Sequence, residues 1–389
     1  MKRFSRALFK RPVAGASFVV LVLLYGGMLF AEFLSPYTPT EVFRESSYHP
    51  PNLRIYSPEL GLRLQVQRYA LVDDINWTYA RLRGEYVPVR LFVPGPEYRL
   101  WGLIPMSLHL FGTTEAYSGD SGLVGIGSGG EAADADERAR AAEIWDTGWR
   151  TEPVYLMGAD NLGRDLFSRI LYGSRVSLTI GFIGIAISLT LAIILGGLAG
   201  YFGGWSDWLI MRIAEFFILI PGLYVILFLR SLLSREMDSG QSFLLITVIL
   251  SFVGWPGSAR LIRGLVHSIK REDFIVNAQL EGIPPLVIIF RHIIPQMSSI
   301  LIVSITLGIP GFILGETVLS YLGLGIVDPA VSWGSLLNRE VTTLANLRNF
   351  PWFLYPGLFL LLTTLAFNFL GDLLRDVLDP YYRERKIGV

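Results

Sequence analysis

KREDFIVNAQLEGIPPLVIIFRHIIP, which occupies residues 270–295, is a polar stretch with a basic start that lies between two apolar segments, 241–266 and 298–325. A helix needs about 20 apolar residues to cross the hydrocarbon core of a bilayer, and both segments are long enough. The stretch between them is therefore predicted to be a loop at one face of a membrane.

This loop has the features of a helix–turn–helix finger. Residues 273–280 suit a short helix, Gly282 can adopt the positive φ of a tight turn, and Pro284-Pro285 can open a second short helix that ends before Pro295. Such a finger would be stiff enough to transmit a force applied to it. The alternative is an ordinary connecting loop, because short loops commonly join helices.

Composition places the whole chain in a membrane. Of its 389 residues 52% are hydrophobic and only 17% are charged, which is too apolar for a soluble protein of this size. Basic and acidic residues balance at 33 each, and no basic run beyond the N-terminal one indicates nucleic-acid binding. Because cysteine is absent, a disulfide framework, a thiolate metal site and a cysteine nucleophile are excluded.

The apolar segments predict an all-α polytopic core of six transmembrane helices. They cover about residues 13–30, 176–201, 208–233, 242–266, 298–325 and 352–374. We expect Pro221-Gly222 to kink the third helix, Trp255-Pro256-Gly257 to break the fourth, and Gly308-Ile-Pro-Gly311 to interrupt the fifth. Lysine and arginine gather before the first helix, after the fourth and in the tail, so both termini are predicted to be cytoplasmic.

The second helix carries two further signals. The preceding run 162–175 holds four charged residues and is predicted to lie at the outer surface. Small residues let helix backbones approach closely in lipid, so the glycines of this helix mark its packing faces. These are Gly181, Gly184, Gly196, Gly197 and Gly200.

Residues 35–157 differ from the rest of the chain, because they are rich in proline, tyrosine and charges of both signs and contain no apolar run that could span a membrane. They predict a soluble, β-containing insert on the outer face. Segments 62–67 and 86–93 suit strands, and 81–85 suits the turn between them. The glycine- and serine-rich segment 118–133 predicts a flexible loop, followed by a short alanine-rich helix.

Ala278, Gly282 and the run from Ile288 to Pro295 resemble the cytoplasmic coupling loop of bacterial ABC-importer permeases. The chain departs from that pattern at one place. Where the family usually has Glu-Ala-Ala, it has Val276, Asn277 and Ala278, and the nearest carboxylate is that of Glu281.

Three further segments, 162–175, 332–334 and 374–380, are similar to the dipeptide/oligopeptide permease family in its C-type subunit. The resemblance implies a type I importer permease organised as 1–34, a cytoplasmic N-terminus and first helix, then 35–157, the insert, and 158–389, the permease core with the coupling loop 266–297. It implies a second permease subunit as heterodimeric partner, two cytoplasmic ATP-binding subunits, an external solute-binding protein and surrounding lipid. It also implies a bacterial or archaeal inner membrane.

The resemblance also assigns candidate site residues. Those predicted to couple the permease to the ATPases are Asn277, Ala278, Glu281, Gly282, Arg291, His292 and Pro295. Glu316 is a separate candidate, because a carboxylate within a membrane helix should face the bundle interior, water or a basic partner. We predict that it lines the outer part of the solute path or its gate, with capping of the segment 328–351 as the alternative.

Catalytic patterns are absent from the sequence. There is no P-loop, and the histidines at 49, 109, 267 and 292 lack metal-ligand spacing, so no nucleotide, cofactor or metal is expected in this chain. A permease for dipeptides or oligopeptides is therefore preferred to an intramembrane enzyme. The same architecture carrying an oligosaccharide, nickel or another small metabolite, and an external ligand sensor, are the alternatives. The tail is too short for a sensor's output domain.

Overall fold

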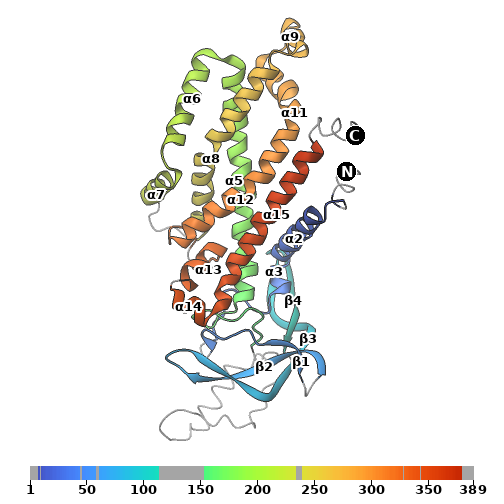
Figure 1. Cartoon of the computed structure of the whole chain (residues 1–389), viewed down its shortest axis with the longest axis vertical. Helices are drawn as coiled ribbons and strands as arrows, with labels where there is room; N and C mark the ends of the chain where they lie inside the picture. Colours follow the sequence, from blue (N-terminus) through green and yellow to red (C-terminus); the bar gives the residue numbers. More distant parts are fainter. Residues whose placement is uncertain are drawn as a thin grey trace, which may run out of the picture. The chain divides into compact units, whose positions relative to one another are not determined.

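The computed structural model (Figure 1) describes residues 8, 10–43, 46–57, 61–113, 153–233, 239–326, 328–341 and 343–378. The expected loop 118–133, the expected alanine-rich helix after it, residues 234–238, the basic tail and most of the basic N-terminus lie outside these residues. The chain divides into two compact units. Unit 1 comprises Met1–Gly26, Gly173–Leu344 and Leu354–Val389, and unit 2 comprises Gly27–Tyr172 and Ala345–Phe353.

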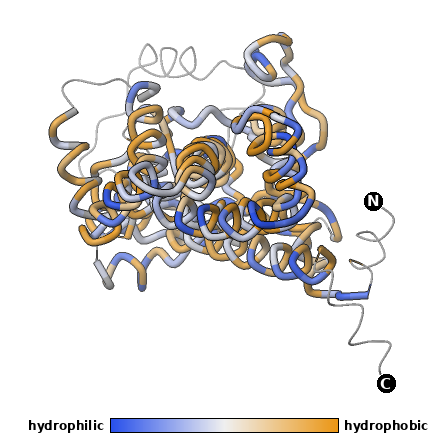
Figure 2. Tube along the Cα trace, turned by 90° about the horizontal axis from the view of Figure 1, so that it is seen from above, coloured by the Kyte–Doolittle hydropathy of each residue, from blue (hydrophilic) through white to orange (hydrophobic). Residues whose placement is uncertain are grey.

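Long apolar helices form most of unit 1, and apolar residues dominate their course in Figure 2. Among the described residues, five helices are long and apolar enough to cross a membrane. They are α2 (Pro12–Leu29), α5 (Leu166–Phe202), α8 (Ser239–Ile269), α12 (Ser298–Tyr321) and α15 (Tyr355–Leu378). The prediction of a polytopic helical protein is confirmed at this level.

The predicted third span is not one helix. It consists of α6 (Gly204–Leu219) and α7 (Gly222–Leu233), neither of which reaches the length of a span, and both pack against α8. Ile220 lies at the junction with ψ 127, the extended conformation that a residue before proline prefers. Pro221 therefore ends a helix where only a kink was predicted.

Two predicted interruptions are wrong, because α8 and α12 run continuously through Pro256 and Pro310. Membrane helices tolerate proline where neighbouring helices and local adjustments satisfy the freed backbone groups. Gly308 serves packing, because a Cβ there would lie 2.6 Å from Cδ1 of Ile185 in α5.

Glycines of α5 mark its packing faces, as predicted. A Cβ on Gly184 would lie 2.5 Å from the ring of Phe312, and one on Gly181 would lie 2.9 Å from Ile309 and Ile313. At the other end of α5, a Cβ on Gly200 would lie 2.6 Å from the backbone oxygen of Arg263. The backbone of α5 thus lies directly against α12 and α8.

The chain's two described ends meet in unit 1. Arg11, before α2, donates a hydrogen bond to Asp376 of α15 at 2.5 Å. The segment before α15 contains α13 (Trp333–Glu340), α14 (Leu344–Asn349) and the 3-10 turn η3 (Pro351–Leu354). α13 packs against both α12 and α15.

Unit 2 contains a four-stranded antiparallel sheet in the order β1-β2-β3-β4. Its strands are β1 (Leu53–Ser57), β2 (Gly61–Asp73), β3 (Thr78–Leu100) and β4 (Ile104–Thr113), and the short helix α3 (Ala31–Leu34) packs on β3 and β4. Its core is formed by Val66, Val87, Val89 and Val154. The sheet is larger than predicted, because β2 and β3 extend beyond the predicted segments 62–67 and 86–93 and because β1 and β4 add two further strands.

The predicted turn at 81–85 is wrong, because these residues lie within β3. The chain turns at 74–77 instead, where Asp73 Oδ1 accepts hydrogen bonds from the backbone nitrogens of Ile75 and Asn76 at 2.9 and 3.1 Å. An aspartate that bonds the backbone two residues ahead is a local turn signal, and it decides the position of this hairpin.

His49 is buried in unit 2 among three tyrosine rings. Its ring lies 4.8–5.3 Å from those of Tyr69, Tyr79 and Tyr155, and its Nδ1 is 2.7 Å from the carbonyl oxygen of Pro50. Because a carbonyl only accepts, Nδ1 carries the proton of the neutral ring. Burial lowers the pKa of His49 from 6.5 to about 4, although the bond to Pro50 opposes this.

We expect unit 2 to lose stability on acidification. The unfolded histidine binds a proton near pH 6.5 and the folded one only near pH 4, so stability is lost as the pH falls between these values, by at most about 3 kcal/mol. Hydrogen exchange of residues 46–57, corrected for intrinsic rates, should show less protection at about pH 5 than at about pH 7.5. His49→Phe, which keeps an aromatic ring, should remove most of this difference; an undiminished difference would assign it to other groups.

Candidate functional site: the finger 270–296

The finger, residues 270–296, joins α8 to α12. It begins with α9 (Asp273–Leu280), as predicted. After the turn, α10 (Pro285–Val287), the π-helix η2 (Ile288–Ile293) and α11 (Ile294–Gln296) form one continuous helical run. The predicted end before Pro295 is therefore wrong. In the π-helix, Ile294 donates to the carbonyl of Ile289, and this wider winding makes room for a proline ring that would clash with a carbonyl in a regular helix.

Gly282 closes α9 through two backbone hydrogen bonds. Its φ is 73, as predicted, and its N–H donates to the carbonyl of Gln279 at 3.1 Å, while that of Ile283 donates to Ala278 at 3.1 Å. This pair of bonds is the Schellman motif, which satisfies carbonyls that a helix end leaves free. The direction in which the second half of the finger leaves α9 is thus fixed by the left-handed conformation of Gly282.

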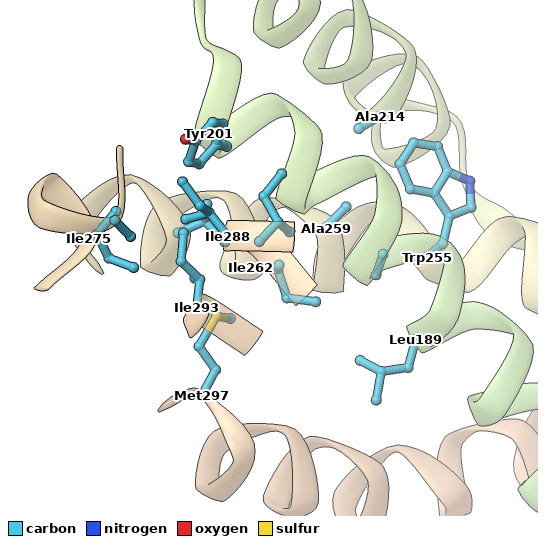
Figure 3. Close-up of a cluster of buried hydrophobic side chains, with 14 residues drawn as sticks. Leu189, Tyr201, Ala214, Trp255, Ala259, Ile262, Ile275, Ile288, Ile293 and Met297 are labelled. Carbon is cyan, nitrogen blue, oxygen red and sulfur yellow. The ribbon is translucent and has the colours of Figure 1, made fainter. Parts of the chain in front are cut away.

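The inner face of the finger belongs to a large buried cluster of unit 1 (Figure 3). Finger residues in this cluster are Ile275, Ala278, Ile288, Ile289 and Ile293. They pack with Tyr201 of α5 and with Trp255, Ala259, Ile262 and Val266 of α8. Interiors of this kind are close-packed, so the finger and the ends of α5 and α8 are packed into one body.

Polar contacts fasten the base of the finger. Lys270 Nζ donates to the carbonyl oxygen of Tyr201 at 2.5 Å and lies 5.0 Å from the centre of its ring. Arg263 of α8 makes two 2.5 Å bonds to Asp207 in the first turn of α6. A planar guanidinium paired in this way holds its partner in a defined orientation, so α6 is joined to the same body.

The outer face of the finger exposes large apolar side chains. They are Phe274, Val276, Leu280, Leu286, Val287 and Phe290, and Leu280 is the most exposed at 81%. Of the candidate coupling residues, Ala278 is buried and His292 is half-buried, whereas Asn277, Glu281, Gly282, Arg291 and Pro295 are exposed. An exposed apolar patch of this kind on one side of a rigid element is typical of a protein-interaction surface.

Glu316 lies away from the finger, in a buried polar cluster of unit 1. Its carboxylate accepts hydrogen bonds from Ser320 at 2.6 Å and from Ser177 of α5 at 3.1 Å. Each serine oxygen in turn accepts a backbone N–H, that of Ile326 at 3.0 Å and that of Trp333 at 3.1 Å. Glu316 is fully buried, and it connects α5, α12 and the start of α13 through these two serines.

The sequence interpretation missed a buried ionic cluster in unit 2. Arg164 and Arg169 pair with Asp160 Oδ2 at 2.7 and 2.9 Å, and all three side chains are at most 6% exposed. Asp160 lies just before the charged run and compensates these arginines, so the charges of the run do not require exposed side chains. An acid four and nine residues before two arginines was the available signal.

In the part of the chain that the structure describes, no cluster of three or more histidine, aspartate and glutamate side chains could hold a metal ion. The molecule is thus a multi-pass helical membrane protein, and its finger is packed on one face and exposes large apolar side chains on the other. Comparison with known proteins identifies the family. Residues 192–384 match the binding-protein-dependent transport system inner membrane component, and residues 1–51 match the N-terminal transmembrane domain of oligopeptide transport permease C.

Known permeases resemble the chain over most of their length. The oligopeptide transport system permease protein OppC of Haemophilus influenzae is 39% identical over 60% of this chain and 75% of its own. The dipeptide transport system permease protein DppC of Bacillus subtilis is 40% identical over 58% and 68%. The chain belongs to the OppC/DppC-type permeases of binding-protein-dependent peptide ABC transporters. It is a multi-pass inner-membrane component without a catalytic site, and ATP is bound by separate subunits.

Proposed function

We propose that the chain forms one half of a peptide-translocating path, with a second permease subunit as the other half. It works with two cytoplasmic ATP-binding subunits and an external solute-binding protein. The match to a binding-protein-dependent system and to oligopeptide and dipeptide permeases supports this proposal. An oligosaccharide, nickel or another small metabolite is the alternative cargo, and mass spectrometry of solute that co-purifies with the assembled transporter would decide between them.

We further propose six membrane crossings with both termini in the cytoplasm. The bent pair α6 and α7 would make the third crossing, since together they cover 204–233 and both lie along α8. The contact between Arg11 and Asp376 supports a common side for the two termini. Residues 35–157 would then form the external insert, and the finger would face the cytoplasm. In this arrangement 1–34, 35–157 and 158–389 are the functional parts of the chain.

The finger would dock on an ATP-binding subunit and transmit its movement. The observation that carries this proposal is the contrast between its two faces, one packed into the ends of α5 and α8 and the other apolar and exposed. A rigid body held in this way transmits displacement of its tip to the membrane helices, which is how rocking bundles give alternating access. Val276, in place of the usual glutamate, adds to the apolar face, so this docking would rely more on apolar burial.

Leu280→Glu should disrupt this docking. The side chain is 81% exposed and projects from the end of α9, so a buried charge at the interface would be unpaired, while the fold of the chain itself would be unaffected. We expect co-purification of the ATP-binding subunits to fall at least about tenfold, which corresponds to 1.4 kcal/mol.

Leu62→Glu is the matched control, because Leu62 is 83% exposed and lies on β2 of unit 2. It should leave co-purification unchanged. Equal recovery of the ATP-binding subunits with both variants, at equal amounts of inserted chain, would contradict the proposed docking face.

A further inference from the structure

The hairpin between β3 and β4 contacts the end of a membrane helix. The indole Nε1 of Trp101, in the loop 101–103, donates a 2.8 Å hydrogen bond to the carbonyl oxygen of Leu29, the last residue of α2. The Trp101 ring also lies 5.8 Å from that of Phe30. α2 is long and apolar enough to cross a membrane, and the last residue of such a helix lies at the boundary between hydrocarbon and headgroups. The hairpin tip is therefore held at that depth.

The side chains at this tip are apolar and exposed. Trp101, Leu103 and Ile104 are 49%, 78% and 48% exposed, and they continue the exposed surface of Leu29 and Phe30 at 47% and 42%. The run from Leu100 to Met106 contains no charged or hydroxyl-bearing residue. In water such a loop would normally be polar, with glycine, asparagine or aspartate at its centre.

At the tip, a tryptophan adopts a left-handed backbone conformation that normally favours glycine. Trp101 has φ 55 and Gly102 has φ 74, and Leu103 donates to the carbonyl of Leu100 at 3.1 Å. Glycine adopts left-handed values freely, whereas a bulky L-residue does so only when another interaction compensates the strain. In Trp101 that compensation is the bond to Leu29, and the preference of tryptophan for membrane interfaces fits the same position.

The hairpin is also fastened to the chain just after α2. His109 Nδ1 lies 2.9 Å from the carbonyl oxygen of Ser35, and the ring of Phe92 lies 6.3 Å from that of Phe33 in α3. These contacts hold β3 and β4 against the segment that follows α2, at Phe33 and Ser35. The tip is thus positioned by a rigid support, and its depth does not depend on one hydrogen bond.

We propose that the β3–β4 hairpin is a membrane anchor that inserts Trp101, Leu103 and Ile104 into the headgroup and upper acyl region of the bilayer beside α2. The occupant of this apolar surface is lipid, because the surface continues from the end of a transmembrane helix. Exposed Arg99, next to the tip, is placed to meet lipid phosphate. The anchor would fix the orientation of the insert relative to the membrane surface.

A test compares the two hairpin tips of the same sheet. The natural chain has no cysteine, so Leu103→Cys and Ile75→Cys can each carry one environment-sensitive fluorophore. Ile75 lies in the loop between β2 and β3 and is 85% exposed, which makes it a matched control. The full chain is labelled, assembled with its partners and reconstituted in vesicles of phosphatidylethanolamine and phosphatidylglycerol.

The fluorophore at position 103 should emit at shorter wavelength and lose most of its fluorescence to nitroxide-labelled lipid, while aqueous iodide has little effect. The one at position 75 should behave in the opposite way. Equal quenching of both sites by iodide would overturn the proposal. Protection of position 103 from both quenchers would also overturn it, because a protein would then cover the tip. Ile104→Cys serves as the second position if Leu103→Cys does not assemble.

Discussion

Gly282→Val is expected to leave the chain inserted in the membrane but to separate the finger from its ATP-binding subunit. Gly282 has φ 73, and a Cβ there would meet no atom within 4 Å, so the whole effect would come from the backbone conformation. A β-branched residue in this conformation costs about 1–3 kcal/mol. Loss of the Schellman bonds would redirect the second half of the finger, and the fraction of correctly shaped fingers would fall roughly 5- to 150-fold.

The measurement is solute-stimulated ATP hydrolysis by the reconstituted transporter, together with co-purification of the ATP-binding subunits. Gly282→Asn is the control, because asparagine adopts the left-handed conformation more easily than other L-residues. We expect Asn to retain most of the coupling and Val to lose most of it. If Val supported normal stimulation, the fixed geometry of the finger would not be needed for coupling.

Local signals predicted the finger well. Its first helix lies at residues 273–280 as predicted, and the positive φ of Gly282 was evident from the pattern of a glycine after a short helix. The errors at Pro256 and Pro310 arose because the local signal is overridden by tertiary packing. A proline normally ends a helix, but in these two helices packing by neighbours outweighs that preference. Which helices pack against these prolines cannot be inferred from the sequence of the helix alone.

Unit 2 was harder to predict for two physical reasons. The hairpin position depends on Asp73, whose side chain bonds the backbone of Ile75 and Asn76, whereas the turn was predicted at 81–85. Burial of the arginines at 164 and 169 was not predicted, because charges are costly to bury. Their burial is compensated by Asp160, so the prediction required a pairing across nine residues.

Glu316 was predicted from its cost in a membrane, and two roles were left open for it. The bonds from Ser177 and Ser320, which lead on to the backbone of Trp333 and Ile326, favour our proposal that it holds the segment before α13 against α5 and α12. In that role the carboxyl group is a structural clamp between α5, α12 and the segment before α13. In the other role, as a gate, it would become accessible to water during transport.

Glu316→Ala should lower both stability and transport. Removal of its carboxyl group leaves two buried serine hydroxyls without their acceptor, which costs about 1–3 kcal/mol for each group, so the effect should be among the largest of any single residue in this chain. Glu316→Gln keeps the shape and one acceptor and should be intermediate. For a clamp, the transport rate and the melting temperature of purified transporter should fall together across wild type, Gln and Ala.

Glu316→Cys separates the clamp from the gate. Because the chain contains no other cysteine, a membrane-impermeant thiol reagent reports on this position alone. The side chain at position 316 is fully buried, so a clamp should resist labelling with and without nucleotide. Labelling that switches on in one nucleotide state would instead identify Glu316 as part of the gate, especially if Glu316→Gln had reduced transport without lowering the melting temperature.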